Sequence, residues 1–138
     1  SQGTLFIDGT NSAGVTTVGK VVGGGKATSI TNLNVAGLTY PGGVDVAPNG
    51  NYLILDEPAD AINVYRGRSN VPIATIPLNE SEFPITFALT RNESAFYVAD
   101  AATSEAERYP FPWGGSPTRF IVEGGEPVGL AVIPRAKL

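Results

Sequence analysis

Short segments in which apolar and polar residues alternate recur along the chain at a constant spacing. One segment begins at Gly43, a second at Thr86 and a third at Gly129, so the repeat is 43 residues long. Alternation with a period of two is the pattern of a half-buried β-strand. Each segment follows a proline, and these are Pro41, Pro84 and Pro127. Proline lacks a backbone N–H and suits the first residue of a strand, so we name this predicted strand A.

Three further strand patterns recur after strand A. Predicted strand B covers residues 4–8, 52–56 and 95–100. Predicted strand C covers residues 14–18, 61–65 and 106–109. Predicted strand D covers residues 27–30, 73–76 and 118–121. Helical periodicity of useful length does not occur, and the chain therefore reads BCD, ABCD, ABCD, A.

Four short strands that repeat about every 40 to 45 residues predict the blades of a β-propeller. The predicted fold class is all-β, with three four-stranded antiparallel units in the permuted order BCD-ABCD-ABCD-A. The whole of 1–138 is expected to form a single repeat domain. Its first blade has strands B to D at about 3–33 and is completed by strand A at about 127–134. The second blade covers about 41–78 and the third about 84–122.

Two stretches of the chain carry a resemblance to a known family. Residues 40–56 read YPGGVDVAPNGNYLILD, and residues 126–134 read EPVGLAVIP. Both resemble the repeat unit of NHL- and YVTN-type β-propellers, and lactonase-like six-bladed propellers use a related unit. The middle copy departs from this unit, with Ile85, Thr86 and Phe87 where a glycine is expected. The resemblance implies the same propeller fold that the strand spacing predicts.

Three blades are too few to close a ring, because closed propellers have about four to eight. We therefore expect a homo-oligomer in which two chains form a six-bladed ring, the C-terminal strand A of each completing the first blade of the other. The residues expected at this interface are Leu5, Ile7, Leu130 and Val132. Alternatively, the chain is part of a longer propeller, or copies stack head to tail into a filament.

Charge and composition exclude several function classes. The net charge is −4 and the nine basic residues are scattered, which disfavours nucleic acid as a partner. No apolar run approaches the roughly 20 residues of a membrane-spanning helix, so no membrane partner is expected. The chain has no histidine and no cysteine. This removes thiol nucleophiles, disulfides, imidazole metal sites and Ser-His-Asp triads. A non-enzymatic role is favoured.

Three aspartates, Asp8, Asp56 and Asp100, follow strand B at equivalent places. Carboxylates around a central channel could bind Ca²⁺ through their oxygens, and this is the one cofactor that the sequence indicates. A residue that recurs in every repeat is more often part of the scaffold. An aspartate at a strand end commonly caps the following turn through its side chain.

Further carboxylates are expected in the loops between strands B and C, namely Asp56, Glu57, Asp60, Glu105 and Glu107. Two neighbouring carboxylates could raise the pKa of one and make it a general base. The lactonase-like resemblance implies a central metal held by Glu, Asn and Asp side chains, but that set does not map onto individual residues here. On solvated loops these side chains would mainly keep an acidic protein soluble.

The densest aromatic stretch holds Tyr109, Phe111 and the only tryptophan, Trp113. Prolines on both sides of Phe111 stiffen this stretch, which falls at the end of strand C. A rigid aromatic loop can bind a protein partner or a sugar ring. The alternative is that Trp113 covers the space between neighbouring blades.

The favoured function is a non-enzymatic β-propeller module for binding and assembly, which joins further blades to close a ring. One alternative is half, or a fragment, of a metal-dependent lactonase-like hydrolase. Another is a structural subunit of an extracellular polymer. A secreted or periplasmic location is expected from the family resemblance and from the composition. Asn79 and Asn92 begin N-glycosylation sequons, which matter if the protein comes from a eukaryotic secretory pathway.

Overall fold

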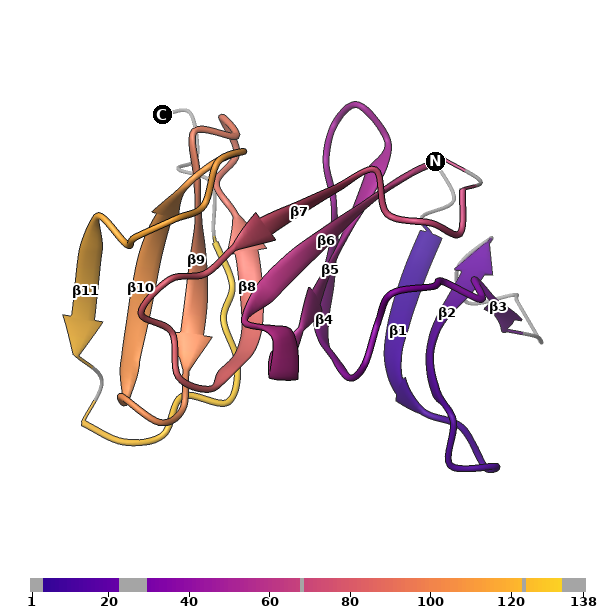
Figure 1. The fold of residues 1–138 in the computed structure, drawn as a ribbon, viewed down its shortest axis with the longest axis horizontal. Coiled ribbons are helices and arrows are strands. Elements are labelled where there is room, and N and C mark those ends of the chain that lie inside the picture. Colours follow the sequence, from indigo (N-terminus) through magenta and orange to yellow (C-terminus); the bar gives the residue numbers. More distant parts are fainter. Residues whose placement is uncertain (1–3, 23–29, 68, 123, 133–138) are drawn as a thin grey trace, which may run out of the picture.

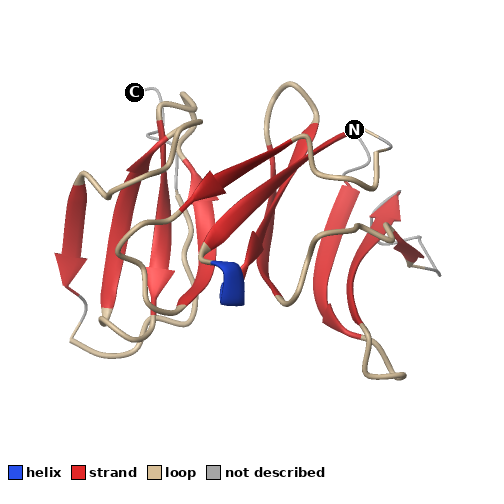
Figure 2. Cartoon of the chain, in the orientation of Figure 1, coloured by secondary structure: helices blue, strands red, loops and turns tan. Residues whose placement is uncertain are grey.

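The computed structural model describes residues 4–22, 30–67, 69–122 and 124–132, and in them the chain is built almost entirely of strands (Figures 1 and 2). The strands form three antiparallel sheets that stand side by side. The described helix is a single short 3₁₀ turn, η2 (Glu57–Ala59). Within these ranges no helix is long and apolar enough to cross a membrane. The predicted all-β fold class is confirmed.

Each sheet follows the order of the chain. The first sheet contains β1 (Thr4–Thr10), β2 (Thr16–Val22) and β3 (Thr31–Asn32). The second contains β4 (Pro41–Val46), β5 (Asn51–Asp56), β6 (Ala61–Arg66) and β7 (Ala74–Pro77). The third contains β8 (Pro84–Leu89), β9 (Ala95–Asp100), β10 (Glu105–Pro110) and β11 (Arg119–Val122). The innermost strands β1, β4 and β8 lie next to one another.

The second and third sheets repeat the same pairing in detail. Pro41 begins β4 and lies opposite Asp56, while Pro84 begins β8 and lies opposite Asp100. In both ladders the register shifts directly after the proline. A bulge at this place accommodates a residue that cannot donate a hydrogen bond to the ladder. The 43-residue repeat of the sequence is therefore a repeat of backbone geometry.

The last predicted copy of strand A is not a strand within one chain. Residues 124–132, which hold Leu130 and Val132, form no strand, and 133–134 lie outside the described residues. In the described sheet β1 is the edge strand, with β2 as its neighbour. Completion of the first sheet by the C-terminal segment of a second chain stays a prediction. Most of predicted strand D at 27–30 also lies outside the described residues.

Hydrophobic side chains fill the junction between the second and third sheets. This cluster contains Ala47, Leu53, Leu55, Ile62, Val64, Ile76, Leu78, Phe87, Phe96, Val98 and Tyr109. The Phe96 and Tyr109 rings stack with their centroids 5.4 Å apart. Burying one such side chain is worth roughly 1.5–3 kcal/mol, so this junction is the main hydrophobic core.

The junction between the first and second sheets is smaller. Val18 packs against Ile54, and the ring of Phe6 lies 5.1 Å from that of Tyr52. Leu5 and Ile7, which are expected at an interface with a second chain, lie on the other face of β1 and are 55% and 41% exposed. Successive side chains of a strand alternate between its faces, so a shift of one residue exchanges them.

The loop after β10 connects the third sheet to the end of β7. Gly115 donates its N–H to the Pro77 carbonyl at 2.9 Å and accepts the Asn79 N–H at 2.9 Å. Gly114 has φ 63°, and a Cβ there would collide with the Pro77 carbonyl oxygen and with Ile76. Only glycine satisfies both the left-handed backbone and the close approach.

Substituting Gly114→Ala should destabilise the protein more than Gly124→Ala. The two glycines have similar φ values, 63° and 59°, but nothing lies within 4 Å of a Cβ at Gly124. Both variants therefore share the backbone cost, and only Gly114→Ala adds overpacking of about 1–3 kcal/mol. Urea unfolding measures the difference, and equal free energies of unfolding would show that this contact is not tight.

Candidate functional site

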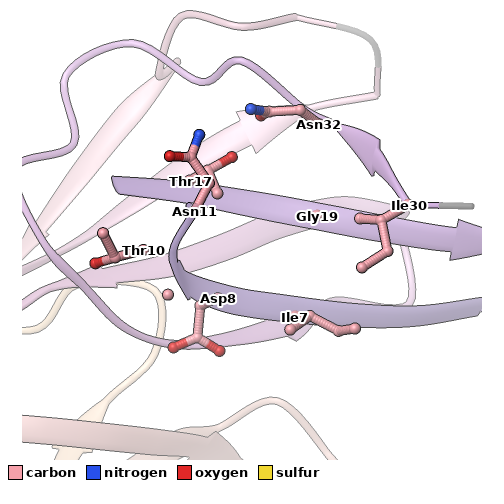
Figure 3. Close-up of a pocket in the computed structure, with 9 residues that line it drawn as sticks. Ile7, Asp8, Thr10, Asn11, Thr17, Gly19, Ile30 and Asn32 are labelled. Atoms are coloured by element: carbon pink, nitrogen blue, oxygen red, sulfur yellow. The ribbon is translucent and has the colours of Figure 1, made fainter. Parts of the chain in front are cut away.

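The first sheet has one face that no other described element covers. Leu5, Ile7 and Ile30 are exposed on this face, which we call the open face. A hollow of about 320 Å³ lies there. Figure 3 shows Ile7, Thr17, Gly19 and Asn32 among the residues that line it. The side chain of Ile30 occupies the space that a Cβ at Gly19 would need. A group of exposed apolar side chains on an otherwise folded sheet indicates a contact surface for protein.

A second hollow of about 370 Å³, the inner cleft, lies where the innermost strands come together. Asp8, Glu57 and Val128 line it, with the backbone of Gly42 and Gly43 between them. Burial raises the pKa of Glu57, and the carboxylates of Asp8 and Asp56 raise it further. Paired carboxyls of this kind can bind a cation or hold a proton.

Asp56 connects strand β5 to the linker that enters its own sheet. Its two carboxylate oxygens accept the N–H groups of Thr39 at 3.0 Å and Tyr40 at 2.9 Å. It does not cap the η2 turn that follows it. The predicted cap of the following turn is therefore wrong for Asp56, because its oxygens are directed at the linker that precedes Pro41.

Asp100 performs the same role in the third sheet and also caps its turn. It accepts hydrogen bonds from Ser81, Glu82 and Phe83 in the linker, and from Ala102 and Thr103 in the turn. Burial alone would raise the pKa of this carboxyl. The hydrogen bonds to its charged form outweigh burial, so the pKa of Asp100 lies below its ordinary value.

Asp8 stands apart from the other two aspartates. It is exposed, and its carboxylate lies near Glu57 rather than at a linker. Among the described residues no group of three or more acidic side chains is arranged to hold a metal ion. The structure thus does not gather Asp8, Asp56 and Asp100 into one metal site, and a Ca²⁺ role remains a prediction from the sequence.

Two buried tyrosines add a second connection to the linkers. Tyr65 on β6 donates its hydroxyl to the Ala36 carbonyl at 2.8 Å. The hydroxyl oxygen of Tyr109 on β10 likewise lies 3.1 Å from the Asn79 carbonyl oxygen. Both hydroxyls reach the segment that precedes the innermost strand of their own sheet. Since Tyr109 is fully buried, the aromatic stretch of the sequence does not act as one exposed surface.

The remaining aromatic candidates separate in the structure. Phe111 packs on the core between the second and third sheets, whereas Trp113 is 77% exposed. Trp113 alone is available to a partner, and its binding role stays a prediction. Asn79 and Asn92 are exposed, but Ser81 of the first sequon is buried and donates to Asp100.

Glu107 is the functional candidate that sequence reasoning placed wrongly. It lies within β10 and is fully buried, not in a solvated loop. Its position opposite Val98 directs the side chain at the core. The available signal is that Glu107 shares a face of the strand with Tyr109, two residues on, but a glutamate is rarely expected on a buried face.

The chain matches no protein-family model and no curated protein. Solved structures are similar to it. Kuenenia stuttgartiensis hydrazine synthase, which contains a β-propeller, has a TM-score of 0.59 and 20% identity over 89% of this chain. A putative 6-phosphogluconolactonase from Bacteroides uniformis has a TM-score of 0.51 and 12% identity over 85%. The chain spans 33% and 39% of their lengths, so these similarities show a propeller-like fold.

Removing the Asp100 carboxylate should destabilise the protein far more than removing that of Asp8. In Asp100→Ala the linker donors lose their acceptor, at a cost of about 3 kcal/mol. Asp8→Ala, the matched control, should change the free energy of unfolding by less than about 0.5 kcal/mol. Urea unfolding at neutral pH measures both.

The Asp100 contribution should also depend on pH. Its folded pKa is lowered, so the stabilisation is present above the unfolded pKa and is lost as the pH falls through the folded one. The difference in the free energy of unfolding between wild type and Asp100→Ala should become smaller at acidic pH. A gap independent of pH, or equal losses in the two variants, would contradict this role.

Proposed function

We propose that this chain is a unit of propeller blades that joins further blades and acts as a non-enzymatic module for binding and assembly. The observation that carries this proposal is the open face together with the free edge of β1. Exposed edge strands next to apolar side chains promote association unless another element covers them. The natural occupant of this position is another four-stranded blade.

The junction between the second and third sheets shows which side chains pack between neighbouring blades of this chain. Where the third sheet packs on the second, Phe87 and Phe96 lie against Leu53 and Leu55, all at most 5% exposed. The open face presents Leu5 and Ile7, side chains of the same kind. An incoming blade with aromatic and branched residues would bury them in the same way. The similar solved structures are more than twice as long as this chain, which leaves room for additional blades.

The free edge of β1 requires a strand in addition to a face. Residues 127–132 carry the third copy of the strand A pattern but pair with no strand within the described chain. We propose that Leu130 and Val132 of one copy lie beside β1 of a second copy, as a dimer. We further propose that the repeats are of the NHL or YVTN type and that the protein is secreted or periplasmic.

The inner cleft supports a second candidate, a metal-dependent lactonase-like hydrolase. Asp8 and Glu57 place two carboxyls in this cleft, and the pKa of Glu57 is raised. A hydrolase of this kind would retain a divalent ion and lose activity toward simple lactones when a chelator removes it. Metal analysis of the purified protein, with Asp8→Asn as the variant, tests this candidate. Absence of bound metal together with no lactone hydrolysis would exclude it.

The assembly proposal predicts that a charge on the open face prevents association. Light scattering over a hundredfold dilution should give about twice the 14.3 kDa chain mass for the wild type. Ile7→Asp should reduce this to the mass of one chain, because a carboxylate in an apolar junction loses its hydration.

Val71→Asp is the matched control, since Val71 is 57% exposed but lies in the loop between β6 and β7 of the second sheet. Its mass should equal that of the wild type. Val132→Pro tests strand pairing separately from packing on the open face, because proline disrupts strand pairing and leaves the open face unchanged. A monomeric wild type would refute the dimer, and much larger species would favour a polymer subunit.

A further inference from the structure

Glu107 is a buried carboxyl between two sheets that no role described so far explains. It is fully buried on β10, two residues before Tyr109. The equivalent residue of the second sheet, two residues before Tyr65, is the neutral Asn63. Asn63 uses both ends of its amide, donating to the Gly37 carbonyl and accepting from Thr75. Glu107 thus stands where the other sheet carries a neutral side chain.

The hydrogens at Tyr109 do not suffice if Glu107 is ionised. The Tyr109 hydroxyl oxygen lies 3.1 Å from the Asn79 carbonyl and 2.6 Å from Glu107 Oε2. A phenol carries one hydrogen, and a carboxylate carries none. In the second sheet Tyr65 donates its hydroxyl hydrogen to the carbonyl of Ala36 in the linker. If Tyr109 does the same, the hydrogen of the 2.6 Å contact belongs to Glu107.

The second carboxyl oxygen of Glu107 also indicates that the group is protonated. Glu107 Oε1 is buried and has no hydrogen-bond partner among the described residues. An unpaired oxygen costs much less free energy in a neutral carboxylic acid than in a carboxylate that bears a full charge. The geometry therefore favours the acid over the anion.

The charged groups that face Glu107 are acidic. Asp100 approaches from β9 and Glu105 lies on β10 itself. Glu80 in the linker and Asp60 at the end of η2 add negative charge around Tyr109 and Asp100. Burial raises the pKa of Glu107 and both Asp100 and Glu105 raise it further, while the hydrogen bond with Tyr109 acts in the opposite direction.

We propose that Glu107 is a protonated carboxylic acid in the folded protein and forms a proton-dependent connection between the third sheet and the linker before it. Glu107 Oε2–H donates to the Tyr109 hydroxyl, and Tyr109 donates to the Asn79 carbonyl. Ionisation removes one hydrogen from this chain, so Tyr109 can serve only one of its two acceptors. The attachment of the third sheet to the linker then weakens as the pH rises.

The sign of the pH dependence is opposite to that of Asp100. The folded state holds a proton that the unfolded chain releases near its ordinary pKa. Stability from Glu107 is complete below the unfolded pKa and is lost as the pH rises through the folded pKa. Between the two values the unfolding equilibrium constant should increase about tenfold per pH unit through this group alone.

Glu107→Gln tests the proposal because glutamine keeps the shape and a hydrogen-bond donor but cannot ionise. Urea unfolding from about pH 4 to about pH 8 should show that the variant lacks this tenfold step per pH unit. Glu82→Gln, exposed in the linker before the third sheet, is the matched control and should keep the wild-type slope. Parallel pH profiles for wild type and Glu107→Gln would overturn the proposal.

A second readout detects the proton directly and does not require the variant to fold. Isotope-edited infrared spectra of the wild type at neutral pH should contain the C=O band of a carboxylic acid, and NMR of the glutamate side-chain carboxyl carbons should show one that titrates well above the others. Glu82→Gln should retain both signals. A wild type in which every glutamate is ionised at neutral pH would refute the proposal.

Discussion

The propeller-like arrangement depends on one kind of contact. In the second and third sheets, an aspartate at the end of the sheet's second strand binds the backbone of the linker that precedes the sheet. Asp56 and Asp100 each accept the N–H groups of the two residues just before the proline that starts the sheet. Linker backbone at a sheet junction has no ladder partner, and leaving its donors unpaired is costly. A carboxylate with two oxygens satisfies both donors at once and thereby connects the linker to the end of the second strand.

The tyrosines on the third strand strengthen the same connection from the other side. Tyr65 and Tyr109 are fully buried, and each has its hydroxyl at a linker carbonyl while its ring lies in the core. An aromatic ring supplies apolar area, and its hydroxyl supplies the hydrogen bond that a buried carbonyl requires. Linker position and core packing are therefore coupled, and Glu107 adds a proton to that coupling in the third sheet only.

The first sheet shows what happens when the connection is absent. Asp8 occupies the corresponding place in the sequence, but it lies beside Glu57 and its strand presents the opposite face to the second sheet. β1 lies next to β4, and Leu5 and Ile7 are at the surface. The same asymmetry makes the first sheet the side at which further blades are proposed to join.

Much of the architecture was readable in the sequence. Strands of the second and third sheets lie close to their predicted bounds, because period-two alternation, prolines and turns are local features. The repeat of 43 residues also predicted that these two sheets are copies, and the structure adds that both carry a bulge after Pro41 and Pro84. The candidate site was less accessible, because a pattern of residue types does not say which face of a strand is covered.

The sequence by itself determined the strands, their order and the repeating aspartates, all of which follow from local preferences and spacing. The tertiary structure alone decided that Asp56 and Asp100 bind linkers while Asp8 does not. It also decided that Tyr109 and Glu107 are buried while Trp113 is exposed. Burial and hydrogen-bond partners depend on segments far apart in the chain, such as Asn79 and Tyr109, and the identity of one residue does not specify its distant neighbour.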